Sequence, residues 1–299
     1  MGRYYPLRVR LACATVLAVA ASASGLDPVA ARTGRGRAVA GRTSSSQPLV
    51  PSHDLLLETT RGRLRIIDLA GHPLRQAARI VGHGRWEQIQ LAPDRRHAFV
   101  SLYEPRRLYE LDLATGSSHF IARAYSPTLS PDHTKLAYLT VDLMGRTLSL
   151  VLRNLRSGTQ RSIPFVPPVL PGTPPEWVMN WSPDGSEIAL IAEGKTVVID
   201  LETATAIGAQ TIHPGLAPAF VDQGTLVVLA DCCVGPQQLV TLDLASGSTA
   251  PFARLSSPTE YIKRIGPGRF LVLDALRELL VVEKGRSRAI ATGLSAVSI

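Results

Sequence analysis

Short apolar runs recur along the chain from residue 52 onward, and most of them alternate hydrophobic with polar side chains. The clearest group is Trp86–Leu91, Ala98–Leu102, Leu108–Leu113 and His119–Ala122, with turn residues between the runs. Alternation with a period of two over about four to eight residues predicts β-strands. No stretch between residues 52 and 299 shows convincing helical periodicity, so the pattern predicts an all-β protein.

Two kinds of turn separate these strands at regular spacing. The first is Ala/Ser-Pro-Asp, which occurs at residues 92–94, 130–132 and 182–184. Proline presets the dihedral of a turn's second position, and aspartate hydrogen-bonds the backbone two residues further on. The second kind ends a strand with Asp-Leu or a variant, and its copies begin at Asp68, Asp112, Asn154, Asp200 and Asp243, with a degenerate copy at Val282–Gly285. The intervals of 40 to 46 residues match one four-stranded propeller blade of about 40–50 residues.

These six landmarks predict a six-bladed β-propeller of four-stranded antiparallel blades over residues 52–299. The first unit has room for only three strands, at Leu55–Thr59, Arg63–Leu69 and Arg75–Val81, whereas Leu294–Ile299 remains after the last unit. We therefore expect the C-terminal strand to complete the first blade, because such closure removes open sheet edges. Seven blades are less expected, since a seventh landmark is missing.

The Ser-Pro-Asp-Gly turns followed by apolar runs, best seen at Trp181–Gly185, resemble the propeller repeats of the TolB translocation protein. Similar repeats occur in the propeller domains of prolyl-oligopeptidase-like enzymes. The resemblance covers residues 52–299 and implies a scaffold, not an activity. The additional α/β domain of TolB has no counterpart of sufficient length here, the Gly-x-Ser-x-Gly elbow of the peptidases is missing, and Asp-Leu replaces the Trp-Asp ending of WD repeats.

The first 51 residues have the layout of an export signal and a linker. Residues 1–23 combine three arginines, an apolar core and a small-residue cleavage site, which is typical of a signal peptide; an uncleaved anchor is the alternative. Residues 24–51 are rich in Ala, Arg, Ser and Gly without periodicity, which predicts a disordered linker. We expect a protein exported to the periplasm, the cell envelope or the medium, with no membrane span after cleavage.

Charge and cysteine content limit the possible partners. The formal net charge is +8, but residues 1–42 hold seven arginines and one acid, so the remaining chain is only +2. A nearly neutral propeller lacks the footprint of a nucleic-acid binder. Beyond the leader, the cysteines are the adjacent pair Cys232 and Cys233, and their bridging stays open. Without Cys-x-x-Cys or His-Glu-x-x-His, the sequence predicts no metal site and no cofactor.

The family geometry implies that loops between second and third strands emerge on the same face as the loops between blades. We expect a protein or peptide partner in the cell envelope to bind this face, because loops on a rigid scaffold commonly carry binding. Its predicted contact residues are Arg85, Arg106, Arg107, Tyr125, Trp177, Cys232 and Cys233. Each has the alternative of an ordinary surface or blade-packing role. The proline-rich insertion Ile163–Trp177 is expected to form a stiff flap over this face.

The sequence favours a non-catalytic, monomeric interaction propeller. Its seven histidines are scattered and no catalytic residue is predicted. An extracytoplasmic enzyme or small-ligand receptor with a site in the central channel is the alternative, because a site assembled from several blades leaves no local motif. A structural module of an envelope complex is a third interpretation.

Overall fold

The computed structural model describes residues 55–59, 64–68, 70, 72–76, 86–92, 94–102, 106–141, 148–165, 179–192, 195–211, 218–230, 236–292 and 294–298. The predicted leader at residues 1–23 and the predicted linker at residues 24–51 lie outside these residues. The described part contains 24 strands, and none of it forms a helix long and apolar enough to cross a membrane.

One sheet of the described part has eight strands. Its order is β3 (Pro73–Gln76), β2 (Leu64–Ile67), β1 (Leu55–Thr59), β24 (Leu294–Ser298), β4 (Trp86–Leu91), β5 (His97–Leu102), β6 (Arg107–Asp112) and β7 (Ser118–Ala122). Its neighbours pair antiparallel except β24 and β4, which meet in parallel at Ser298 and Ile89.

The other four sheets have four antiparallel strands each, and their order follows the chain. The first two consist of β8 (Ala124–Leu129), β9 (Lys135–Val141), β10 (Leu148–Asn154) and β11 (Gln160–Phe165), then β12 (Asn180–Trp181), β13 (Glu187–Ala192), β14 (Lys195–Asp200) and β15 (Thr205–Thr211). The last two consist of β16 (Ala219–Phe220), β17 (Thr225–Leu229), β18 (Gln237–Asp243) and β19 (Thr249–Leu255), then β20 (Thr259–Gly266), β21 (Arg269–Asp274), β22 (Leu279–Glu283) and β23 (Arg286–Ala291). The predicted all-β propeller of four-stranded antiparallel blades is thereby confirmed.

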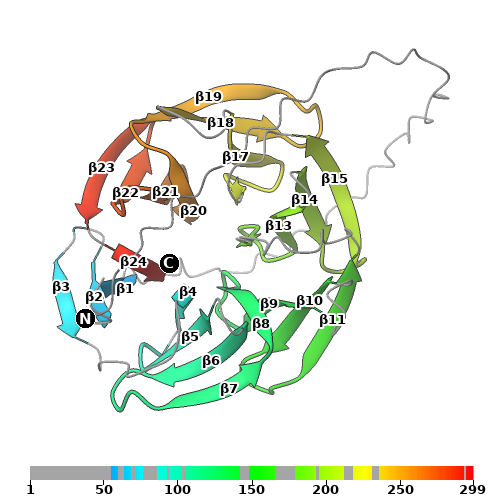
Figure 1. Ribbon diagram of the computed structural model, residues 1–299. Coiled ribbons are helices and arrows are strands. Elements are labelled where there is room, and N and C mark those ends of the chain that lie inside the picture. Colours follow the sequence, from blue (N-terminus) through cyan, green and yellow to red (C-terminus); the bar gives the residue numbers. More distant parts are fainter. Residues whose placement is uncertain are drawn as a thin grey trace, which may run out of the picture. The chain divides into compact units, whose positions relative to one another are not determined.

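Apolar clusters join each sheet to the next and lead back to the first. Phe99 of β5 packs with Leu136 of β9, and Leu139 of β9 packs in turn with Leu190 of β13. Similar clusters join β14 to β17, β17 to β21, and β21 back to Ile67 of β2. Burial of these side chains is the main stabilising term between blades, at about 25 cal/mol per Å² of apolar surface. The sheets therefore follow one another around a ring (Figure 1).

The C-terminal strand pairs with the first strand of the described part. Leu56 lies opposite Ser298 and Leu57 opposite Val297 in an antiparallel register between β1 and β24. The expected pairing of the C-terminal segment with the first unit is confirmed. The two ends of the propeller are thus held by one sheet (Figure 1).

The Pro-Asp turns form as their sequence predicts. Ser182 Oγ donates to Asp184 Oδ1 at 2.8 Å and accepts the Glu187 amide at 2.9 Å, which closes the turn between β12 and β13. Ala92 stands at the serine position in the turn before β5, and there Asp94 Oδ1 accepts the His97 amide itself, at 3.0 Å. The aspartate side chain therefore replaces the missing hydroxyl.

The second kind of turn needs a left-handed residue near its end. Gly116, Gly158 and Gly247 have φ between 70° and 76°, a conformation that glycine adopts without steric cost. Ala204 takes the equivalent position after Asp200 with φ 57°. The Asp200 carboxylate accepts the amides of Glu202 and Thr203, both at 2.8 Å, and holds this turn despite the alanine.

Two local predictions were wrong. The third strand of the first unit is Pro73–Gln76 and begins before Arg75, because proline is tolerated as the first residue of a strand. Tyr125, predicted as a loop residue between two blades, lies in β8, and only Arg123 separates β7 from β8. A left-handed Ser126 (φ 55°) and a bulge before Thr128 bend this strand, so that it enters the sheet early despite Pro127.

Candidate functional site

The two ends of the β4–β7 blade carry different chemistry. We call the end with Arg106 and Arg123 the loop face, and the opposite end, with the turns at Asp94 and Asp112, the turn face. Strand β5 runs from the turn face at His97 to the loop face at Leu102. A strand of six residues spans about 20 Å, so the two faces present separate surfaces.

Three exposed arginines gather at the loop face of this blade. Arg106 and Arg107 stand at the start of β6, and Arg123 stands between β7 and β8. Because Leu108 lies opposite Ala122 in the register of β6 and β7, Arg107 and Arg123 occupy neighbouring strand ends. We call Arg106, Arg107 and Arg123 the arginine cluster.

Aromatic rings hold two of these arginines. The guanidinium carbon of Arg106 lies 5.6 Å from the centre of the Tyr125 ring, within cation–π range. Arg107 Nη1 donates to the Tyr109 hydroxyl at 3.4 Å. The Tyr109 and Phe120 rings meet edge to face with centroids 5.7 Å apart. The guanidinium groups are therefore pre-oriented, which lowers the entropy lost when they bind a ligand.

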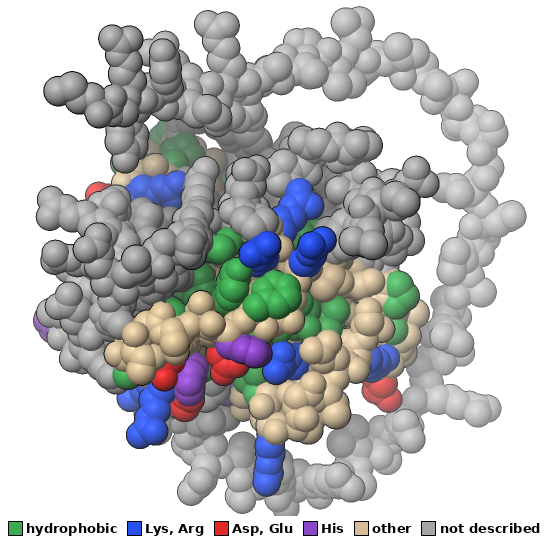
Figure 2. Space-filling view, turned by 60° about the horizontal axis from the view of Figure 1, so that its bottom comes forward, with side chains coloured by type: hydrophobic (Ala, Val, Ile, Leu, Met, Phe, Trp, Pro, Cys, Tyr) green, Lys and Arg blue, Asp and Glu red, His purple; other side chains and the backbone are tan. Residues whose placement is uncertain are grey.

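Apolar surface accompanies this charge. Phe120 is 48% exposed, whereas Tyr125 beneath Arg106 is only 3% exposed. Figure 2 shows Lys and Arg side chains beside hydrophobic ones in the middle of the visible face, with His and acidic side chains below them. A surface that combines arginine with aromatic rings is typical of anchors in protein interfaces.

The structure brings together three of the predicted site residues, Arg106, Arg107 and Tyr125. Arg85, Trp177, Cys232 and Cys233 lie outside the described residues, as do residues 166–177 of the proline-rich insertion; its first three residues, 163–165, belong to β11. The contact residues predicted from the sequence did not include Arg123, Tyr109 or Phe120. Tyr109 and Phe120 both lie in predicted strands that follow one another in the sequence. Only the register of β6 and β7, which places Tyr109 opposite Phe120, shows that the two rings meet.

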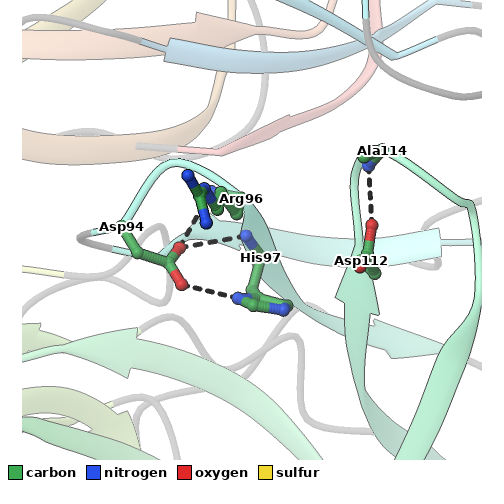
Figure 3. Close-up of polar contacts among 5 residues, drawn as sticks. All are labelled: Asp94, Arg96, His97, Asp112 and Ala114. Atoms are coloured by element: carbon green, nitrogen blue, oxygen red, sulfur yellow. Dashed lines mark hydrogen bonds and ion pairs between the residues drawn. The ribbon is translucent and has the colours of Figure 1, made fainter.

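The turn face of this blade is occupied by hydrogen bonds of the turns themselves (Figure 3). The Asp94 carboxylate accepts the amides of Arg96 and His97 and contacts His97 Nδ1 at 2.6 Å. The hydrogen bond with Asp94 raises the pKa of His97 despite partial burial. Burial opposes ionisation of Asp94, but its bonds with His97 and Arg96 prevail and lower its pKa. Asp112 accepts the Ala114 amide at 2.7 Å, so these carboxylates serve as turn-stabilising groups.

Polar side chains connect the first strands of separate blades. Asn180 Nδ2 of β12 donates to the carbonyls of Pro218 at 3.0 Å and of Ile262, in β20, at 3.1 Å. Lys263 Nζ, also of β20, donates to Gln90 Oε1 of β4 at 2.9 Å. Burial lowers the pKa of Lys263 to about 7. Among the described residues, no group of three or more His, Cys, Asp and Glu side chains is placed to hold a metal ion.

The fold is similar to several solved propellers at low sequence identity. A candidate TolB from Agrobacterium tumefaciens is 15% identical with a TM-score of 0.54, over 81% of this chain and 92% of that one. TolB from Acinetobacter baumannii is 15% identical with a TM-score of 0.51, over 82% and 64%. A chain of a nidogen–laminin complex is 10% identical with a TM-score of 0.57, over 82% and 97%. No protein-family model and no curated protein sequence matches the chain.

Proposed function

We propose that this protein is an exported, non-catalytic β-propeller that binds a protein or peptide partner in the cell envelope through its loop face. The observation that carries the proposal is the arginine cluster, with Arg106 over the ring of Tyr125. Oriented guanidinium groups beside an exposed Phe120 match a partner that presents carboxylates next to apolar side chains. The three positive charges also attract such a partner over a distance of about 8–10 Å at physiological salt.

We further propose six blades. The eight-stranded sheet divides naturally at the parallel contact between β24 and β4, where one residue pair, Ser298 and Ile89, is in register. Division there gives a blade of β24, β1, β2 and β3 and a blade of β4 to β7. Together with the four four-stranded sheets, this makes six units, in agreement with the six landmarks of the sequence.

The likeness to other propellers supports a binding role in two ways. The similarity to TolB structures concerns the scaffold, and the predicted leader at residues 1–23 directs such a scaffold out of the cytoplasm. A similar fold also occurs in a chain of a nidogen–laminin complex, which is an assembly of proteins. We expect the exported protein to act as a monomer.

A capture experiment with matched variants tests the proposed face. Tagged full-length protein is incubated with extract of the exported fraction, and bound proteins are identified by mass spectrometry. The variant Arg106→Gln/Arg107→Gln is expected to lose a partner that wild type retains. The control Arg95→Gln/Arg96→Gln removes the same charge from an exposed pair in the turn between β4 and β5 and is expected to retain it. Equal capture by both variants would exclude the loop face as the binding surface.

A small-ligand receptor or enzyme with a site in the central channel is the second candidate. It is favoured by Lys263, whose lowered pKa and bridge to Gln90 of another blade are typical of a functional lysine. A thermal-shift screen of sugars, nucleotides and divalent metal ions discriminates the two. A compound that raises the melting temperature of wild type but not of Lys263→Met supports the channel site.

A further inference from the structure

A second charged site lies on the β20–β23 blade, at the end away from the loop-face connections. A cavity of about 580 Å³ opens there against strands β21, β22 and β23. Its lining includes Arg269, Val281, Glu283, Lys284, Arg286 and Arg288. Small-molecule sites in proteins occupy about 300–1,000 Å³, so the cavity has room for a ligand.

The strand register places the charged side chains on one side of the sheet. Arg269 lies opposite Glu283, and Glu283 lies opposite Arg286, so these three form one row across β21, β22 and β23. Arg288 lies opposite Val281, two residues along the same strands, and therefore on the same side. Val281 is buried against Leu271 and Ile67, which fixes that side toward β2. The cationic cavity thus continues the apolar contact between two blades.

The described lining of this cavity is mainly cationic. Among the described residues that line it, Arg269, Lys284, Arg286 and Arg288 are basic, and Glu283 is acidic. Arg269 Nε lies 3.3 Å from Glu283 Oε2. Arg286 lies opposite Glu283 in the register of β22 and β23, on the other side from Arg269.

Protection of the sheet edge does not explain the whole cluster. Outer strands often carry charged residues that prevent pairing with other chains, and this role fits Arg286 and Arg288 on β23. Arg269 stands on β21, between β20 and β22, and its side chain is only 35% exposed. Lys284 takes the first position of the turn into β23 at φ 49°, where Asn, Asp or Gly is favoured. Edge protection therefore does not account for Arg269, and the left-handed turn position of Lys284 does not itself require a cation.

We propose that this cavity binds a small phosphorylated molecule through Arg269, Lys284, Arg286 and Arg288. The planar guanidinium fork matches phosphate oxygens with paired N–H donors, and several arginines together favour an anion of more than one charge. Glu283 orients Arg269, whose Nε it approaches to 3.3 Å, and limits binding of singly charged anions. The cavity lies beside the turn after Gly266 and the turn at Lys284, at the end opposite the loop-face connections. The proposal is therefore independent of the partner-binding face.

Calorimetric titration of the full chain with inorganic pyrophosphate at constant ionic strength tests this site. Wild type is expected to bind pyrophosphate, and Arg286→Gln/Arg288→Gln to bind it at least tenfold more weakly. The control Arg156→Gln/Arg254→Gln removes two exposed arginines from other blades and is expected to stay within twofold of wild type. Glu283→Gln is expected to bind at least twofold more tightly, whereas Glu202→Gln, an exposed acid elsewhere, leaves the affinity unchanged.

A second arm distinguishes free phosphate compounds from a lipid headgroup. Vesicles of phosphatidylglycerol in phosphatidylcholine are offered to the same variants. Vesicle binding that depends on Arg286 and Arg288, without pyrophosphate binding, assigns the phosphate to a lipid. If the double variant misfolds, Lys284→Gln in the exposed turn replaces it, with an expected loss of at least threefold. Absence of binding to both probes, or equal loss in the Arg156→Gln/Arg254→Gln control, would overturn the proposal.

Discussion

The guanidinium of Arg106 lies over the ring of Tyr125, at 5.6 Å, and this contact joins two neighbouring blades. Arg106 precedes β6, whereas Tyr125 belongs to β8, the first strand of the next blade. The buried ring, 3% exposed, is a fixed platform that orients the charged side chain. The direction of Arg106 therefore depends on how the two blades pack.

Two substitutions of Tyr125 distinguish the contribution of the aromatic ring from that of the hydroxyl group. Tyr125→Phe keeps the aromatic face and is expected to bind the captured partner within twofold of wild type. Tyr125→Leu removes the cation–π contact, which is worth about 0.5–1 kcal/mol at an exposed site, so binding is expected to weaken about two- to fivefold. Surface plasmon resonance with the purified partner measures both affinities, and circular dichroism verifies that both variants are folded. Equal affinities of the Phe and Leu variants would refute a role for the ring.

The left-handed turn position provides a pair of opposite stability changes. Ala204 has φ 57°, and an alanine in this left-handed conformation is strained by about 1–2 kcal/mol. Ala204→Gly removes this strain, but glycine loses more conformational entropy on folding than alanine does. The net effect is expected to stabilise the protein by about 0.5–1 kcal/mol. Gly158→Ala at the equivalent position is expected to cost about 1 kcal/mol, because alanine is strained in the left-handed backbone conformation. No steric clash adds to this cost, since no atom lies within 4 Å of the new methyl group. Urea denaturation measures both changes, and two shifts of the same sign would contradict the account of this turn.

Asn180 links first strands of separate blades and is expected to be important for stability. Its side chain is 3% exposed and donates to Pro218 O and Ile262 O. Asn180→Ala deprives both carbonyls of this donor and is expected to cost about 2–4 kcal/mol. Asn154→Asp is the control, expected within about 0.5 kcal/mol, because Asp112 and Asp200 accept the same pair of turn amides that Asn154 accepts. Free energies of unfolding from urea titrations test the contrast.

Lys263 predicts a specific dependence of stability on pH. Its pKa is about 7 in the folded protein and 10.5 as an ordinary lysine, so between these values the unfolded chain binds more protons than the folded one. Stability from this group therefore rises from pH 7 to pH 10.5, and below pH 7 the full cost of the buried charge is present. From pH 7 to 9.5, wild type is expected to gain about 3 kcal/mol more than Lys263→Met. Urea titrations at the two pH values measure the difference; parallel changes in both proteins would contradict the lowered pKa.

The sequence predicted the elements that depend on local chemistry. Pro-Asp and Asp-Leu turns impose their hydrogen bonds within a few residues, so the strands on either side of the turns at Asp94 and Asp112 were predicted close to their observed bounds. The pairing of β1 with β24 was also foreseen, because an unfilled unit at one end matched a surplus strand at the other.

Contacts between blades could not be read from the same patterns. Gln90 and Lys263 are 173 residues apart, and Asn180 and Ile262 are 82 apart, so only the closed ring brings them together. The sequence predicts Tyr125 in the connection after the strand His119–Ala122, whereas a bulge between Tyr125 and Thr128 lets β8 begin before Pro127. The sequence predicts Arg106 and Arg107 as surface candidates. It does not predict the ring beneath Arg106, because that contact requires Tyr125 to lie in β8.

The closed propeller on which both proposed surfaces depend is tested most directly by cross-linking its first and last strands. Leu57 and Val297 are partners in an antiparallel pair, where Cα atoms lie about 4.5–5.5 Å apart, within the disulfide range of about 4.4–6.8 Å. Mild oxidation of Leu57→Cys/Val297→Cys is expected to give a bond between these positions in nearly all molecules, as seen by peptide mass spectrometry. The out-of-register pair Leu57→Cys/Ala296→Cys is expected to react far less. A folded protein in which the first pair stays reduced, or in which both pairs react alike, would contradict the closure of the ring.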